Sequence, residues 1–201
     1  EIAKLAPDGG IAVNVIFYSS ATSTTAAAVH RLDWIQLDSA ADSAAFAASI
    51  NSLTRTPPNG TGTDMAAGMS TSIASFANSF DGTRLVMDVS GDGFQNMLTG
   101  TPSGCNYTSP ACLAQLTAQR DAADTAGITV NGLAIGGSSI TNYYTNNVKT
   151  TDGFVIAASS FADFARAAQE KIFREITGVP EPTVMMLLGL GLAGFGFSRK
   201  R

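Results

Sequence analysis

The fold is decided by residues 84–93, RLVMDVSGDG, where a compact apolar run stops abruptly in a loop with two glycines. Such a run followed by Gly-rich punctuation indicates a buried strand and a sharp strand-to-loop junction. A second apolar run of similar length, ITVNGLAI, occupies residues 128–135. Because helical patterns separate these runs, the two strands are expected to lie parallel in one sheet.

Outward from this centre, strand and helix patterns alternate along the chain. A Ser-x-x-Asp capping pattern opens the helix at Ser39, proline favours a helix start after Ser109, and Ser160 with Asp163 suggests a third start. The last helix is expected to turn an apolar stripe inward, made of Phe161, Phe164, Ala168, Ile172 and Phe173. Strands are expected at residues 11–18, 21–29, 34–37, 84–89, 128–135 and 154–157, and helices at 40–53, 63–78, 109–126, 140–146 and 160–176.

This order predicts an α/β fold: a doubly wound, mostly parallel sheet with helices on both faces, forming one domain over residues 1–177. The 201 residues are 45% hydrophobic, which is enough for one sizeable core. Acidic and basic residues number 16 and 12, for a net charge of −4. Without the three cations at the C-terminus the balance is nine against sixteen, so no nucleic acid is expected as a partner.

Catalytic groupings are absent from the sequence. The only histidine is His30, and neither a Ser-His-Asp nor a Cys-His grouping nor a phosphate-binding Gly-x-x-x-x-Gly-Lys motif is present. A binding module is therefore expected, and a hydrolytic enzyme is the less favoured alternative. His30 also has no Cys or His neighbour, which argues against a zinc site.

The two cysteines, Cys105 and Cys112, have six residues between them in a loop with Gly104 and Pro110. Closure of so short a loop is local, and an exported protein meets an oxidising environment. A disulfide is expected, with free thiols as the alternative.

Two loops carry oxygen ligands where a doubly wound sheet collects its ligands, beyond the carboxyl ends of the strands. Thr63 follows Gly60-Thr61-Gly62 at a helix start, and Asp92 lies between two glycines after an apolar strand. A hydroxyl and a carboxylate suit a hard divalent cation such as Mg²⁺. The alternatives are a helix N-cap for Thr63 and a simple turn residue for Asp92. Asp88, on an otherwise apolar strand, is expected to pair with a backbone N–H or with Arg84.

Residues 10–177 resemble the von Willebrand factor A domain, in an uncharacterised bacterial branch that counts as a domain of unknown function. The similarity rests on Ile11-Ala-Val, Val86-Met-Asp-Val-Ser-Gly-Asp-Gly, Gly127-Ile-Thr-Val-Asn-Gly-Leu, Tyr143-Tyr-Thr-Asn-Asn-Val and Phe161-Ala-Asp-Phe.

The resemblance implies a metal-ion-dependent adhesion site, in which Thr63 matches the threonine loop and Asp92 the aspartate loop. The family's Asp-x-Ser-x-Ser loop is expected upstream of Glu1, so this domain is expected to be N-terminally truncated. Residues 88–92 offer a rival match to that loop, which we reject because no threonine and aspartate loops follow them in order.

The C-terminal segment, residues 178–201, has three parts. Pro180-Glu181-Pro182 comes first, an uncharged run from Thr183 to Phe197 follows, and Arg199, Lys200 and Arg201 end the chain. The run would span roughly 22 Å as a short transmembrane helix, and the terminal cations would stop it on the cytoplasmic side.

This order resembles the PEP-CTERM sorting signal of Gram-negative bacteria. The resemblance implies cleavage by an exosortase and release from the inner membrane to the cell surface or beyond. An ordinary uncleaved anchor is the alternative. The sequence thus predicts an exported adhesion module, bound to a protein or to an extracellular polysaccharide matrix component. A structural matrix protein with an inactive metal site is the second hypothesis.

Overall fold

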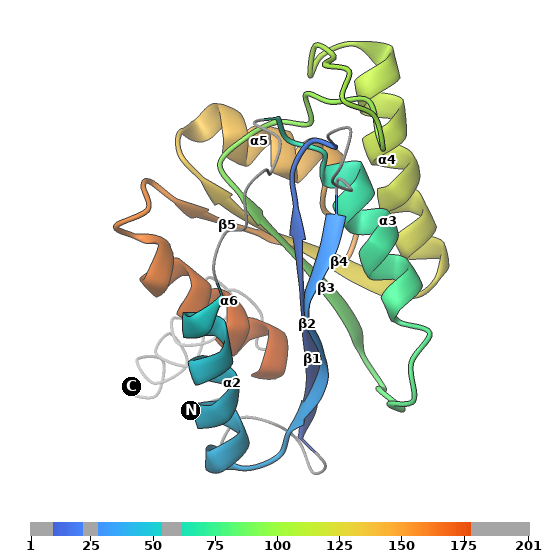
Figure 1. Cartoon of the computed structure of the whole chain (residues 1–201). Helices are drawn as coiled ribbons and strands as arrows, with labels where there is room; N and C mark the ends of the chain where they lie inside the picture. Colours follow the sequence, from blue (N-terminus) through green and yellow to red (C-terminus); the bar gives the residue numbers. More distant parts are fainter. Residues whose placement is uncertain (1–9, 22–27, 54–61, 178–201) are drawn as a thin grey trace, which may run out of the picture.

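The computed structural model describes residues 10–21, 28–53 and 62–177 (Figure 1). The predictions for residues 178–201, including Pro180, Glu181, Pro182, the apolar run and the three terminal cations, lie outside the described residues. Over the described residues, a strand pair and two helices come first, and strands and helices then alternate to the end of the domain.

A parallel three-stranded sheet forms the centre, in the order β3 (Leu85–Gly91), β4 (Ile128–Ile135) and β5 (Val155–Ala158). Its register places Met87 beside Val130 and Leu133 beside Ile156. The expected parallel strands at the centre of the sheet are therefore confirmed.

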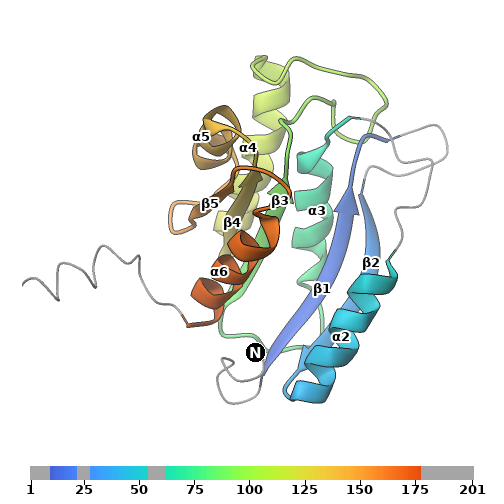
Figure 2. The ribbon, with the colours of Figure 1, turned by 90° about the vertical axis from the view of Figure 1, so that its left-hand side faces the viewer.

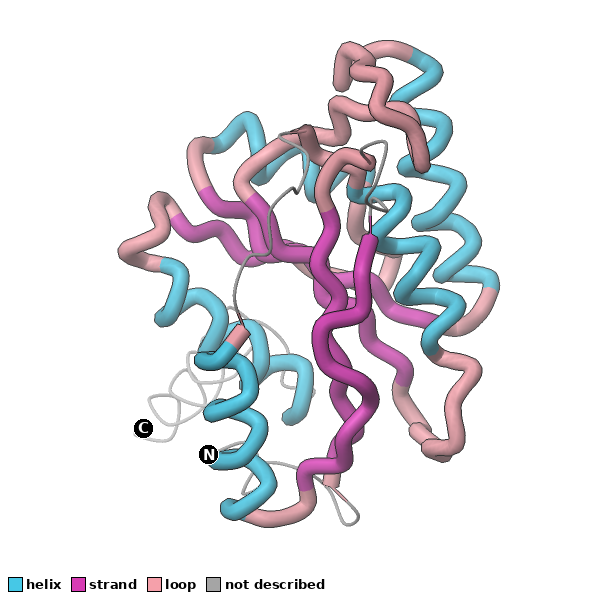
Figure 3. Tube along the Cα trace, viewed as in Figure 1, coloured by secondary structure: helices cyan, strands magenta, loops and turns pink. Residues whose placement is uncertain are grey.

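An antiparallel pair, β1 (Ile11–Tyr18) and β2 (Ala28–Leu37), makes a separate two-stranded sheet. Figure 3 shows the two groups of strands meeting near the middle of the molecule. The predicted break between strands at 21–29 and 34–37 was wrong, because β2 runs without interruption from Ala28 to Leu37, and residues 22–27 lie outside the described residues. Among the described residues β2 pairs only with β1. An antiparallel sheet can leave one face in contact with water, so β2 can carry an exposed polar residue such as Asp33.

Helices cover both faces of the parallel sheet, as predicted. Three of them, α3 (Met65–Ser75), α4 (Pro110–Thr125) and α5 (Ser138–Asn147), share one core with β3 and β4. The last helix, α6 (Phe164–Thr177), packs on the opposite face of β4 and β5, as Figure 2 shows. The remaining helix, α2 (Ala40–Ser52), lies against β2.

The side-chain alternation of β4 explains these two layers. Val130 and Ala134 belong to the core under α3, α4 and α5, whereas Leu133 and Ile135 belong to the core under α6. Successive residues of a strand point to opposite faces, so a continuous apolar run can serve both cores.

Two predicted helix starts are confirmed. Ser39 and Asp42 form a capping box at α2, and the Ser109 side chain accepts from Cys112 N with Pro110 at the first turn of α4. For α3 the N-cap is Asp64, so the N-cap alternative for Thr63 was wrong.

The prediction for the last helix needs correction. It begins at Phe164 and not near Ser160, and the predicted stripe does not face inward: Phe161 is 69% exposed and Phe173 is 46% exposed. The fully buried positions are Ala167 and Lys171. The small side chain of Ala167 lets the helix approach the sheet closely. Lys171 pairs with the carboxylates of Asp88 and Glu175, which the sequence pattern does not reveal.

Candidate functional site

Two loops meet at the carboxyl ends of β1 and β3. The loop before α3 is held to the end of β1, because Ser20 N donates to Gly62 O at 2.8 Å and Gly62 N donates to Ser20 Oγ at 3.1 Å. The same loop bonds to the loop after β3, through Thr63 N to Asn96 Oδ1 at 2.7 Å and Asn96 N to Thr63 O at 3.0 Å. The structure thus fixes Thr63 beside the loop that carries Asp92.

Glycine at position 93 makes this approach possible. A Cβ at Gly93 would lie 3.0 Å from Thr63 Oγ1, which is tighter than ordinary contact. The hydroxyl of Thr63 therefore faces the backbone of the Asp92 loop at close range.

The oxygens of Thr63 and Asp92 fit part of a site for a hard cation. Among the described residues, neither Thr63 Oγ1 nor the exposed Asp92 carboxylate has a hydrogen-bond partner, so no internal bond competes with a ligand. A hydroxyl and a single carboxylate are oxygen donors of the kind that Mg²⁺ binds. Within residues 10–21, 28–53 and 62–177, no three His, Cys, Asp or Glu side chains are grouped so as to hold a metal by themselves.

Asp64 supports this loop from below and was not singled out as a functional residue by the sequence. It is fully buried, and its carboxylate accepts from Ala67 N at 3.0 Å, Gln95 Nε2 at 3.1 Å and Gly100 N at 2.9 Å. Hydrogen bonds to a carboxylate are stronger than those between neutral groups. One side chain therefore joins the start of α3 to the loop after β3. Its N-cap position was the one signal in the sequence.

Two tyrosines close the inner side of the site. The Tyr18 hydroxyl donates to Ser90 O at 2.9 Å, and a Cβ at Gly91 would lie 2.8 Å from the Tyr18 hydroxyl and 2.7 Å from that of Tyr144. Burial, with a smaller contribution from the nearby Asp88 and Asp92 charges, raises the pKa of Tyr18 to about 12. Burial also raises the pKa of Tyr144. Both phenols stay neutral at pH 7, so the carboxylates give this end of the sheet a negative potential that favours a cation.

Asp88 has a partner, as expected, but the partner is Lys171 of α6 and not a backbone N–H or Arg84, the examples that the sequence suggested. The Lys171 Nζ–Asp88 Oδ1 distance is 3.0 Å, and Ser90 Oγ also donates to Asp88 Oδ1 at 3.1 Å. Lys171 bonds to Glu175 as well, whose carboxylate accepts from Asn131 Nδ2 at 2.8 Å. This network, which we call the α6 clamp, joins α6 to β3 and β4. It also engages Asp88 in an ion pair away from the Asp92 loop.

Residues 2–180 match the family model described as a protein of unknown function, DUF1194. The chain belongs to the DUF1194 family. The prediction of an uncharacterised family for this domain is thereby confirmed. No curated protein matches the chain.

Residues 178–201 of this DUF1194 protein match the PEP-CTERM protein-sorting motif, as predicted. The motif indicates an exported protein with a membrane-anchored precursor that is processed by an exosortase. Within the part of the chain that the structure describes, none of the helices combines the length and apolar character that crossing a bilayer requires.

One solved structure similar to the DUF1194 chain is the crystal structure of the SpRpn10 VWA domain. The two share 9% sequence identity with a TM-score of 0.49, over 84% of this chain and 75% of the other.

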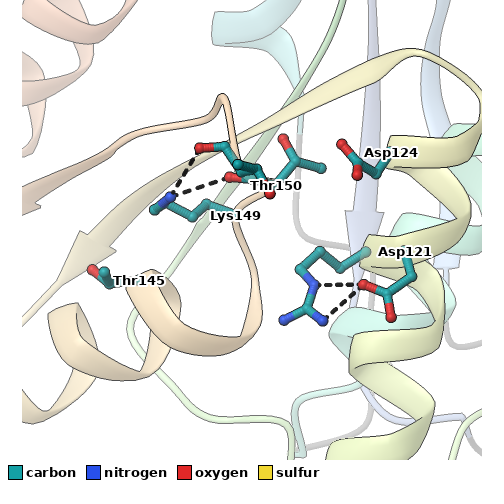
Figure 4. Close-up of a pocket in the computed structure, with 7 residues that line it drawn as sticks. Asp121, Asp124, Thr145, Lys149 and Thr150 are labelled. Carbon is teal, nitrogen blue, oxygen red and sulfur yellow. Dashed lines mark hydrogen bonds and ion pairs between the residues drawn. The ribbon is translucent and has the colours of Figure 1, made fainter.

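A polar cavity of about 240 Å³ lies at the other end of the DUF1194 domain, lined by residues of α4, the end of α5 and the turn after α5 (Figure 4). Thr150 places it where β4 begins, since Thr150 N donates to Val130 O at 3.2 Å. Its cations are already bonded: Arg120 pairs with Asp121 at 2.7 Å, and Lys149 Nζ donates to the Thr150 and Thr151 carbonyls. No predicted site residue lies there.

Cys105 and Cys112 form a disulfide, with their Cα atoms 6.1 Å apart. It joins the loop after β3 to the first turn of α4, beside the Asn96 backbone that contacts Thr63. The disulfide therefore stiffens the same end of the domain that carries Asp92.

Proposed function

We propose that this exported protein is a binding module that holds a divalent cation at Thr63 and Asp92 and uses it to bind an acidic group of a partner. The observation that supports this most strongly is the pairing of the two loops: two hydrogen bonds between Thr63 and Asn96 hold Thr63 against the Asp92 loop. Among the described residues, the Thr63 hydroxyl and the Asp92 carboxylate have no hydrogen-bond partner.

The chemistry of the two ligands suits adhesion. A cation held by one carboxylate and a neutral hydroxyl keeps most of its positive charge and keeps coordination positions for other oxygens. A carboxylate of a surface protein, or of an acidic polysaccharide in the extracellular matrix, would fill one of them. Further ligands would be waters or oxygens outside the described residues.

Binding is proposed in preference to catalysis. The site contains an acid, a hydroxyl and neutral phenols, and the chain has a single histidine in β2. A nucleophile needs an adjacent base with a suitable pKa, and the sequence offers no such grouping.

The second candidate is a structural matrix protein with an inactive metal site. The observation that favours it is that, among the described residues, no three His, Cys, Asp or Glu side chains are grouped so as to hold a metal ion. Metal affinity increases with the number of charged ligands, so a single carboxylate by itself would hold a cation weakly.

Thermal unfolding of the complete protein in increasing Mg²⁺ separates the two. A cation that binds only the folded state stabilises it by about 2.7 kcal/mol at a hundred times Kd. For a domain of this size that corresponds to a rise in Tm of roughly 5–10 °C. Asp92→Asn should abolish the rise, whereas Asp124→Asn, at an exposed carboxylate on α4, should retain it. No rise in the unaltered protein would favour the structural alternative.

A further inference from the structure

Three aromatic rings pack together beside the Asp92 loop: Phe94 from the loop after β3, Tyr107 from the segment before α4, and Tyr143 from α5. Phe94 and Tyr107 stack with ring centroids 4.2 Å apart at 17°, and Tyr143 meets Phe94 edge-on at 5.0 Å and 82°. Tyr143 is buried, whereas Tyr107 is 40% exposed. One face of the Tyr107 ring is therefore covered by Phe94, and 40% of the residue remains accessible to a ligand.

The segment that carries Tyr107 is held in place on every side. The disulfide closes it between Cys105 and Cys112, and Cys105 N donates to Asn96 O at 2.8 Å. Inside it, Asn106 Oδ1 accepts from Thr108 N at 3.0 Å and from Thr108 Oγ1 at 2.8 Å. An exposed ring that is already ordered loses little conformational entropy when a ligand covers it, which is the property of a binding anchor.

The segment that carries this ring has no charged side chain. From Gly93 to Gln119 the sequence contains no Asp, Glu, Lys, Arg or His. The exposed neighbours in the loop, Asn106 and Thr108, are an amide and a hydroxyl. Asn106 uses its oxygen inside the loop, so its amide N–H groups remain for a ligand.

We infer that Tyr107 is the stacking face of a second binding site, one that takes a neutral sugar ring of a polysaccharide. The face of a pyranose presents C–H groups with partial positive charge, which match the electron-rich face of an aromatic ring. Its hydroxyls match uncharged amide and hydroxyl side chains. A phosphate or carboxylate ligand would need cations, and a basic peptide would need anions, and this segment supplies neither.

This site is independent of the proposed cation site. It uses ring stacking and uncharged hydrogen bonds, so the two can succeed or fail separately. Sugar binding through Tyr107 should therefore survive removal of divalent cations with EDTA.

Native affinity electrophoresis of the complete protein, in gels containing soluble neutral glucan, mannan or galactan, tests the inference. At least one of the three should retard the protein, with EDTA present. Tyr107→Ala should weaken this binding by about tenfold or more, the scale of a lost aromatic anchor. Tyr107→Phe keeps the ring and should bind nearly as well as the unaltered protein.

Phe161→Ala is the matched control, because Phe161 is an even more exposed aromatic residue that lies next to α6. It should leave retardation unchanged, and thermal unfolding of each variant checks that the fold is intact. The inference is overturned if none of the three polysaccharides retards the protein, or if Tyr107→Ala is retarded as much as the unaltered protein. Binding of a protein partner that depends on Tyr107, without retardation by any polysaccharide, would assign the ring to a protein interface and overturn it as well.

Discussion

Replacing Lys171 by methionine should cost this protein a large share of its stability. The Lys171 side chain is fully buried and lies between two carboxylates, Asp88 at 3.0 Å and Glu175 one helical turn away. Methionine keeps the length of the aliphatic stem but removes the charge. The α6 clamp would then hold two anions with no cation between them.

The expected loss is set by how deeply each partner is buried. Breaking a buried ion pair by removing one partner costs about 3–5 kcal/mol. The Asp88 side chain is 38% exposed and can turn to water, but the Glu175 side chain is only 14% exposed. Asn131 still donates to Glu175, so we expect the lower end of that range, about 3 kcal/mol.

Urea unfolding of the complete protein measures this loss. Arg166→Met on the same helix is the matched control, because Arg166 is 70% exposed and lies 4.0 Å from Glu170. A surface pair of that kind contributes under about 1 kcal/mol. If Lys171→Met destabilised the protein no more than Arg166→Met does, the clamp would not hold α6 and our reading of it would be wrong.

The pH dependence of this loss is a further consequence. Burial raises the pKa of the Glu175 carboxyl, and Lys171 acts in the opposite direction, so removing Lys171 raises that pKa further. A carboxyl whose pKa is higher in the folded state than in the unfolded state stabilises the fold when it is protonated. This stabilisation is complete below the pKa of the unfolded state, about 4.3, and is lost as the pH rises through the pKa of the folded state. Lys171→Met should therefore cost less at pH 5 than at pH 7, and the double variant with Glu175→Gln should show no such difference.

Three other perturbations follow from contacts elsewhere in the domain. A Cβ at Gly153 would lie 2.0 Å from Val130 O, so Gly153→Ala should push the turn before β5 away from β4. The free energy of unfolding should fall by about 2 kcal/mol or more, and an unchanged Tm would contradict the contact. Cys112→Ser removes the disulfide with Cys105 and should lower the free energy of unfolding by about 2–3 kcal/mol. In guanidinium unfolding, a reductant should lower the midpoint of the unaltered protein to that of the variant, and it should leave the midpoint of the variant unchanged. Asp64→Asn keeps the shape of the side chain but directs amide hydrogens toward N–H donors, so the free energy of unfolding should fall by about 2 kcal/mol. Heat unfolding measures this loss, and a variant as stable as the unaltered protein would refute the role of the buried carboxylate.

Much of the fold could be predicted because its signals are local. Apolar runs bounded by glycine located β3 and β4, and the Ser39–Asp42 pair located the start of α2. The Asp92 loop lies at the carboxyl end of the parallel strand β3, where ligands of α/β sheets collect.

What the sequence did not reveal depends on long-range pairing. A buried lysine contradicts the usual hydrophobic pattern, and Lys171 is buried only because Asp88 and Glu175 lie beneath it. In α6 the fully buried residues are Ala167 and Lys171 while Phe173 is partly exposed, and Phe161 lies before the helix begins, where an inward stripe was predicted. In the same way, Asp64 resembles an ordinary helix cap until Gln95, thirty-one residues later, is seen to bond to it.

The most direct test of the cation site is Mn²⁺ binding to the complete protein, followed by the electron paramagnetic resonance signal of free Mn²⁺. The account predicts one bound Mn²⁺ that Mg²⁺ displaces, a large loss of affinity in Asp92→Asn and a smaller loss in Thr63→Ala, and no loss in Asp124→Asn. No bound Mn²⁺, or the same affinity in Asp92→Asn as in the unaltered protein, would contradict it.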